Sequence, residues 1–146
     1  MTFVEHAESL SRRRILVVDD DQDVREYLTA VLEDAGAEVF AVGDGAAAVD
    51  AARVVKPDLI TLDISMPGRD GGEVLAELRG DEAVSHIPVC IITGRPELRR
   101  LIYERPVRPP EGFETKPIDP VRLVADLRRI LYLADCKRER QAAQGG

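Results

Sequence analysis

The chain has 146 residues, a length typical of one domain, and 45% of its residues are hydrophobic, which is enough to form a core. Its formal net charge of −7 argues against a general nucleic-acid binder, because such proteins carry a basic surface that contacts phosphates. No apolar run approaches the length needed to span a bilayer, and residues 1–14 contain no apolar segment of the kind found in a secretory signal.

Short apolar segments alternate along the chain with segments of helical spacing. Residues 1–13 are polar and without periodicity, so we expect a flexible arm there. Strands are predicted at residues 14–18, 37–42, 58–63, 87–93 and 112–116. A helix is predicted after each strand: between cap residues 20–23 and Gly36, over 46–55, over 73–79, near 98–102, and from Pro120 to about residue 134. Residues 137–146 are expected to form a frayed tail.

This alternation predicts an α/β fold in which a parallel sheet is covered on both faces. Ligands of such sheets bind beyond the carboxyl ends of the strands. The predicted strand ends carry carboxylates, a hydroxyl and an ammonium group, from Asp19, Asp20, Asp63, Thr93 and Lys116. Clustered carboxylates repel one another unless a cation joins them, and oxygen ligands are those that Mg²⁺ prefers. Such a site suits phosphoryl transfer, with one carboxylate as the nucleophile.

Four stretches of the chain, taken in their order and spacing, resemble one protein family. They are ILVVDDD at residues 15–21, PDLITLDISMPG at 57–68, IITG at 91–94 and TKP at 115–117. Over about residues 13–136, the chain resembles the receiver domain of two-component response regulators. The resemblance implies a flavodoxin-like (βα)5 fold, a doubly wound five-stranded parallel sheet in the order 2-1-3-4-5.

The resemblance also implies domain boundaries and a mode of signalling. Residues 1–13 would be the arm, 14–136 the receiver domain and 137–146 the C-terminal tail. With no effector domain after it, the chain is expected to be a stand-alone receiver that signals through protein–protein contacts. It would not be an enzyme, beyond self-catalysed phosphoryl transfer and autodephosphorylation.

Two of the family's functions, phosphoryl acceptance and metal binding, fall on four positions. Asp63 corresponds to the phosphoacceptor, which takes a phosphoryl group from the phosphohistidine of a histidine kinase or phosphotransfer protein. Mg²⁺ would be held by the carboxylates of Asp19, Asp20 and Asp63 and by the backbone carbonyl of Ser65.

The switch positions of the family are matched as well. Thr93 corresponds to the switch hydroxyl that bonds the phosphoryl group, and Gly94 to the small residue that leaves access to it. Lys116 corresponds to the lysine that pairs with the phosphoryl group, and its bond to Pro117 is usually cis in the family. Phe113 corresponds to the aromatic side chain that changes rotamer on activation.

The fourth helix is where the chain departs from the family pattern. Pro109 and Pro110 cannot continue a helix, so this helix should be short and the loop after it irregular.

The face formed by the fourth helix, fifth strand and fifth helix carries signal output in the family, and a downstream protein partner is expected there. This region is basic: residues 15–94 contain 17 acidic and 5 basic residues, whereas residues 95–140 contain 8 acidic and 12 basic ones. The basic side chains near the fourth helix, which suit an acidic partner, are Arg95, Arg99, Arg100, Arg105 and Arg108.

Partners of other kinds, nucleic acid and membrane, are not expected. Cys90 and Cys136 have no metal-binding spacing, so reduced thiols and a cytoplasmic location are the expectation.

Two alternatives from other functional classes remain open. A haloacid dehalogenase-type phosphatase also places an aspartate nucleophile after a strand, but it has a second aspartate two residues later, where this chain has Ser65. The other alternative is an interaction module that keeps the receiver fold and works without phosphorylation. Partner binding that is unaffected by Asp63→Ala would favour it.

Overall fold

The computed structural model describes residues 10–145, and a five-stranded parallel sheet forms its centre in the order β2-β1-β3-β4-β5. This is the predicted topology. The strands are β1 (Arg14–Val18), β2 (Glu38–Val42), β3 (Leu59–Leu62), β4 (Val89–Thr93) and β5 (Gly112–Thr115). The helices are α2 (Gln22–Asp34), α3 (Gly45–Val55), α4 (Gly71–Gly80), the short 3₁₀ helix η1 (Pro96–Arg99), α5 (Arg100–Tyr103) and α6 (Pro120–Gly145). None of the helices in the described region is long and apolar enough to cross a membrane.

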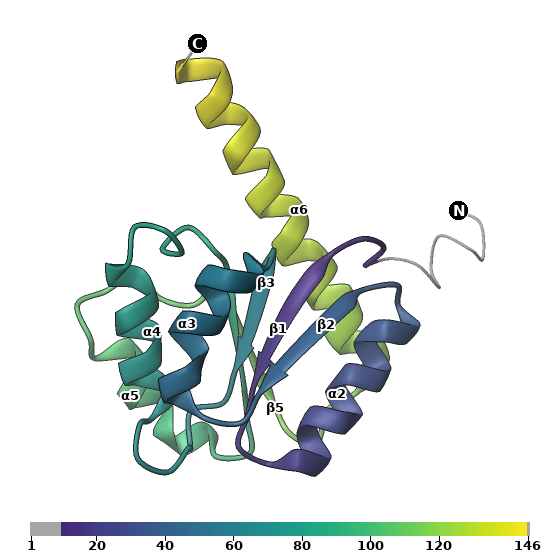
Figure 1. The fold of residues 1–146 in the computed structure, drawn as a ribbon, viewed down its shortest axis with the longest axis vertical. Coiled ribbons are helices and arrows are strands. Elements are labelled where there is room, and N and C mark those ends of the chain that lie inside the picture. The colour runs from purple at the N-terminus through teal and green to yellow at the C-terminus, as the bar shows by residue number, and fades with distance from the viewer. Residues whose placement is uncertain (1–9, 146) are drawn as a thin grey trace.

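Helices cover both faces of the sheet, α2 and α6 on one side and α3, α4 and α5 on the other (Figure 1). Successive side chains of a strand point to opposite faces. In β1, accordingly, Leu16 joins the core under α3 and α4, and Val17 joins the core under α2 and α6. Every residue of β3 and β4 is buried, as expected for parallel strands that are covered on both faces.

Aspartate side chains fix the starts of four helices. The carboxylates of Asp21, Asp44, Asp70 and Asp119 each accept a hydrogen bond from a backbone N–H of the first turn that follows. Such caps satisfy N–H groups that have no partner inside the helix, and negative charge there is favourable. Part of the acidic charge of the first half of the chain therefore has a structural role.

The prediction of a flexible arm over residues 1–13 is wrong for its described part. Leu10 is fully buried in the core to which α2 and α6 contribute, and its N–H donates to the carbonyl oxygen of Ala35 over 2.9 Å. Arg13 forms an ion pair of 2.5 Å with Asp135 of α6. These contacts join segments that are far apart in the sequence, so local periodicity did not reveal them. Residues 1–9 of the predicted arm lie outside the described residues.

The prediction of a frayed tail over residues 137–146 is also wrong where the structure describes it, because α6 continues to Gly145. Residues 137–144, KRERQAAQ, contain no proline or glycine, and Lys, Arg, Glu, Gln and Ala favour helix. This last part of α6 is exposed and projects beyond the sheet (Figure 1). Residue 146 lies outside the described residues.

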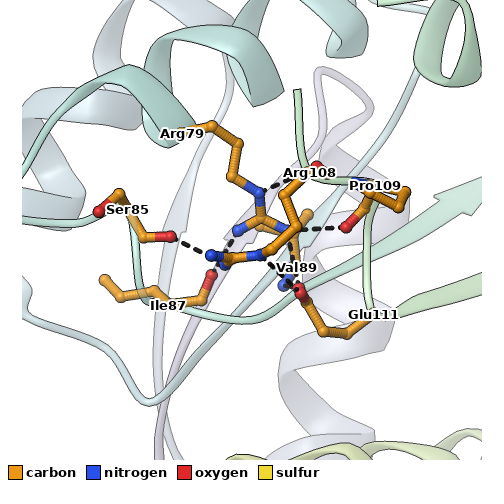
Figure 2. A network of polar contacts seen from close by, with 7 residues as sticks. All are labelled: Arg79, Ser85, Ile87, Val89, Arg108, Pro109 and Glu111. Carbon is orange, nitrogen blue, oxygen red and sulfur yellow. Dashed lines mark hydrogen bonds and ion pairs between the residues drawn. The ribbon is translucent and has the colours of Figure 1, made fainter. Parts of the chain in front are cut away.

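The helical segment between β4 and β5 is short, as predicted, and consists of η1 and α5. A polar network holds the irregular loop that follows α5 (Figure 2). The side chain of Arg79, at the end of α4, is only 4% exposed. Its guanidinium donates to the backbone carbonyl oxygens of Ile87, Arg108 and Pro109 over 2.9, 3.2 and 3.1 Å. It also pairs with the carboxylate of Glu111 over 2.8 Å. One buried cation therefore joins α4 to the segments before β4 and β5.

Glu111 connects the same network to the sheet. Its Oε1 accepts from the backbone N–H of Val89 over 2.7 Å, and its Oε2 accepts from Arg108 over 3.3 Å. Arg108 in turn donates to the carbonyl oxygen of Ser85 over 2.8 Å (Figure 2). The proline-containing loop thus obtains from side chains the fixed position that a longer helix would have given it.

We predict that Glu111→Gln lowers the free energy of unfolding by about 2–3 kcal/mol, because it leaves the buried guanidinium of Arg79 without its counter-charge. Urea unfolding followed by circular dichroism measures the change. The matched control is Glu97→Gln, which removes an exposed partner of Arg95 and should cost far less, because solvent screens an exposed ion pair. Equal losses in the two variants would contradict the assignment.

A buried carboxyl group lies at the contact between β5 and α6. Glu114 is 9% exposed and lies near Asp126 and Arg122 of α6. Burial and the carboxylate of Asp126 raise the pKa of Glu114 to about 7, against the opposing charges of Arg122 and Arg129. The ionised form of Glu114 is therefore disfavoured in the folded protein.

This shift predicts a pH-dependent stability. The folded state binds more protons than the unfolded state between the ordinary pKa of Glu114, 4.5, and its raised value of about 7. The free energy of unfolding therefore falls as pH rises through this range. We expect Glu114→Gln to be more stable than the wild type by about 1–3 kcal/mol near pH 8 and equally stable near pH 4. Urea unfolding at both pH values is the measurement, with exposed Glu82→Gln as control. A difference independent of pH would refute this explanation.

Candidate functional site

Three carboxylates meet at the carboxyl edge of the sheet. β1 and β3 are neighbours, with Val18 opposite Leu62, so the residues that follow these strands lie side by side. One carboxylate oxygen from each of Asp19, Asp20 and Asp63 lies within 4.8 Å of the others. The structure therefore brings together the acidic residues that the strand ends predicted.

The three carboxylates differ in how they are held. Oδ1 of Asp19 accepts from the backbone N–H of Asp21 over 3.0 Å, and Oδ1 of Asp63 accepts from the N–H of Ser65 over 3.3 Å. Asp19 and Asp63 are buried, whereas Asp20 is exposed. Among residues 10–145, the Asp20 side chain has no hydrogen bond to the protein, so its position depends on the backbone that carries it.

Lys116, which directly follows β5, supplies the cation of the site. Its Nζ lies 2.9 Å from Oδ2 of Asp19 and 3.8 Å from Oδ2 of Asp63. The peptide bond between Lys116 and Pro117 is cis. Gly94 lies beside the lysine, since a Cβ at that position would be 3.7 Å from Cδ of Lys116.

The compensation of negative charge by Lys116 is incomplete. Burial raises the pKa of Asp63 to about 6, and the charges of Asp19 and Asp20 act in the same direction. Lys116 and the N–H of Ser65 oppose this rise. A further cation at the site would therefore be favourable, and an all-oxygen donor set suits a hard divalent cation such as Mg²⁺.

Asp63 is closely packed by the loop that follows it. The loop after it returns onto its backbone, where the N–H of Gly71 donates to the carbonyl oxygen of Ile64 over 2.8 Å. A Cβ at residue 71 would lie 2.5 Å from the carbonyl oxygen of Asp63. Only glycine fits this close approach, which places the start of α4 directly against the site.

Thr93 and Phe113 lie on the neighbouring strands β4 and β5, next to the short helices η1 and α5. Thr93 ends β4, is fully buried, and its hydroxyl accepts from the N–H of Arg95 over 3.0 Å. Phe113 of β5 is half-buried, with the guanidinium of Arg99 4.7 Å from its ring centre and the ring of Tyr103 6.4 Å away. The residues of η1 and α5 thus lie directly over the predicted switch aromatic.

Around η1 and α5, less positive charge is available to a partner than the composition indicated, because two of the arginines are engaged within the protein. Arg108 is engaged by Glu111 and by the carbonyl oxygen of Ser85, and Arg95 forms an ion pair with Glu97. Arg99 and Arg100 remain exposed.

One side chain near the site was missed by the sequence analysis. Arg25 of α2 donates to the backbone carbonyl oxygen of Asp19 over 2.8 Å. An arginine one turn after Asp21, the cap of α2, is the only signal that could have identified it.

Known proteins of one family are similar to this chain in sequence and fold. The model of the response regulator receiver domain matches residues 15–128. The DNA-binding response regulator MtrA of Mycolicibacterium smegmatis is 37% identical over 120 residues, which are 82% of this chain and 51% of MtrA. Protein PilH of Pseudomonas aeruginosa is 34% identical over 118 residues, 81% of this chain and 97% of PilH.

A solved structure shows the same fold. The chemotaxis response regulator CheY4 of Vibrio cholerae superposes with a TM-score of 0.73 at 28% identity, over 82% of this chain and 99% of CheY4. The chain spans about half the length of the first curated relatives that it matches. The extent of the family match and the shared topology lead to one conclusion: this chain belongs to the response regulator receiver domain family.

Proposed function

We propose that Asp63 accepts a phosphoryl group from the phosphohistidine of a histidine kinase or phosphotransfer protein, in the presence of Mg²⁺. The observation that carries this proposal is the cluster of three carboxylates within 4.8 Å, with the ammonium of Lys116 reaching two of them. Receiver domains are signalling phosphoacceptors, and this chain has that family's fold together with a site of suitable charge.

The transfer is an exchange of one bond for another. A carboxylate oxygen of Asp63 attacks the phosphorus atom, and a P–O bond forms as the P–N bond of the donor breaks. The imidazole leaves with the electron pair and takes up a proton. Lys116, already 3.8 Å from Asp63, can donate to the phosphoryl oxygens, and the hydroxyl of Thr93 can do the same from the end of β4.

The residues present fit a bound Mg²⁺. Asp19, Asp20 and Asp63 would hold it, together with the backbone carbonyl of Ser65, and the incomplete compensation of charge at Asp63 supports a cation there. Bound Mg²⁺ would supply positive charge that offsets the charge of the incoming phosphoryl group. Gly94, which has no side chain, leaves room beside Lys116 for that group.

The signal would leave through what we call the output face, the exposed surface of η1, α5, β5 and α6. Thr93 and Phe113 link the site to this face, where Tyr103, Val121 and Arg122 are exposed. A bond from Thr93 to the phosphoryl group would shift the end of β4 and with it the segment above Phe113. A downstream protein partner would bind this face differently in the two states.

We predict that acetyl phosphate with Mg²⁺ adds one phosphoryl group to the wild type and none to Asp63→Asn, since the amide is not a nucleophile of this kind. Phos-tag electrophoresis and intact mass spectrometry measure the modification. Asp50→Asn is the matched control, because it makes the same change at an exposed position of α3 and should be modified normally. An unmodified wild type, or equal modification of Asp63→Asn, would refute the proposal and favour a phosphorylation-independent interaction module.

A further inference from the structure

Arg25 reaches from α2 to the backbone of the acidic pair. Its Nη1 donates over 2.8 Å to the carbonyl oxygen of Asp19, which belongs to the peptide group that joins Asp19 to Asp20. On the way it crosses the turn after β2, where a Cβ at Gly43 would lie 3.0 Å from Nη1 and 3.3 Å from Cζ. The missing side chain of Gly43 therefore leaves the space that the guanidinium occupies.

Arg25 forms no ion pair with a carboxylate of the described residues. Within residues 10–145, no carboxylate lies within 4.0 Å of its guanidinium, although this part of the protein is strongly acidic. Arg25 is partly buried, so its positive charge is less screened by water than that of an exposed arginine. It lies against the backbone of Asp19, whose carboxylate belongs to the cluster of three.

The hydrogen bond of Arg25 acts on the backbone that carries Asp20. The peptide N–H of Asp19 donates to the carbonyl oxygen of Val42 over 3.2 Å, so this short segment is held on its other side by β2. The Asp20 side chain, by contrast, has no hydrogen bond to the described protein. Its orientation depends on the torsion angles on either side of the peptide group that Arg25 holds.

We infer that Arg25 is a positioning residue for the cation site: it fixes the Asp19–Asp20 peptide so that the Asp20 carboxylate faces Asp63. This inference rests on the proposed Mg²⁺-dependent function and extends it to a residue that touches neither the metal nor the phosphoryl group. Groups that orient metal ligands in this way typically change metal affinity by about 10–100-fold when removed.

Isothermal titration of the folded protein with Mg²⁺ tests the inference. We expect Arg25→Ala to weaken Mg²⁺ binding by about tenfold or more, and Arg25→Lys to recover part of the loss because an ammonium can still donate. Gly43→Ala should cause a smaller loss in the same direction, since its methyl group displaces the guanidinium without changing an acidic residue. Arg53→Ala is the control for net charge, because it removes an exposed arginine of α3 that lies outside the site.

A double-mutant cycle separates positioning from general electrostatics. If Arg25 acts through Asp20, Arg25→Ala should cost little further Mg²⁺ affinity in the Asp20→Asn background. Circular dichroism and urea unfolding of each variant show that the protein titrated is folded. If Arg25→Ala does not fold, Arg25→Lys and Gly43→Ala still decide the question.

The possible failures are distinguishable. A wild type that binds Mg²⁺ no differently from Arg25→Ala, or equal losses in Arg25→Ala and Arg53→Ala, would overturn the role of Arg25 and leave the proposed function intact. A wild type that neither binds Mg²⁺ nor accepts a phosphoryl group would overturn the proposed function and the inference with it.

Discussion

The mutual repulsion of three carboxylates at one sheet edge is the constraint on which the rest of the site depends. Asp19, Asp20 and Asp63 are gathered within 4.8 Å, and two of them are buried. Such a cluster opposes folding unless cations and N–H donors offset it. Lys116 supplies one cation, and two backbone N–H groups supply hydrogen bonds. Burial is the largest cause that raises the pKa of Asp63 to about 6, and the charges of Asp19 and Asp20 add to it, so a further cation at the site would be favourable.

The opposite edge of the sheet has the reverse arrangement. There a buried cation, Arg79, is engaged by three carbonyl oxygens and by Glu111 (Figure 2). The charge of Arg79 is therefore balanced within the protein, where it joins α4 to the segments before β4 and β5. At the carboxyl edge, by contrast, three carboxylates face a single lysine.

The segment between β4 and β5, which contains the short helices η1 and α5, runs from one edge of the sheet to the other. A longer helix would position the segment between β4 and β5 by its own hydrogen bonds, but the prolines of this segment prevent it. The Arg79 network holds the end of the segment near β5, while η1 and α5 lie over Phe113 near the candidate site. Movement that begins at Thr93 would therefore affect η1 and α5 more than the anchored loop.

The sequence by itself determined the strand–helix order, the sheet topology through its resemblance, and the residues that meet at the carboxyl edge. These features are local, because apolar runs, helix caps and strand-end acids can be recognised without knowing what packs on them. The tertiary structure alone decided the burial of Leu10, the role of Arg79 and the reach of Arg25. Each depends on a partner distant in the sequence, or on a gap left by a missing side chain. The helical end of α6 is different, since the composition of residues 137–144 already favoured helix and the predicted tail overlooked it.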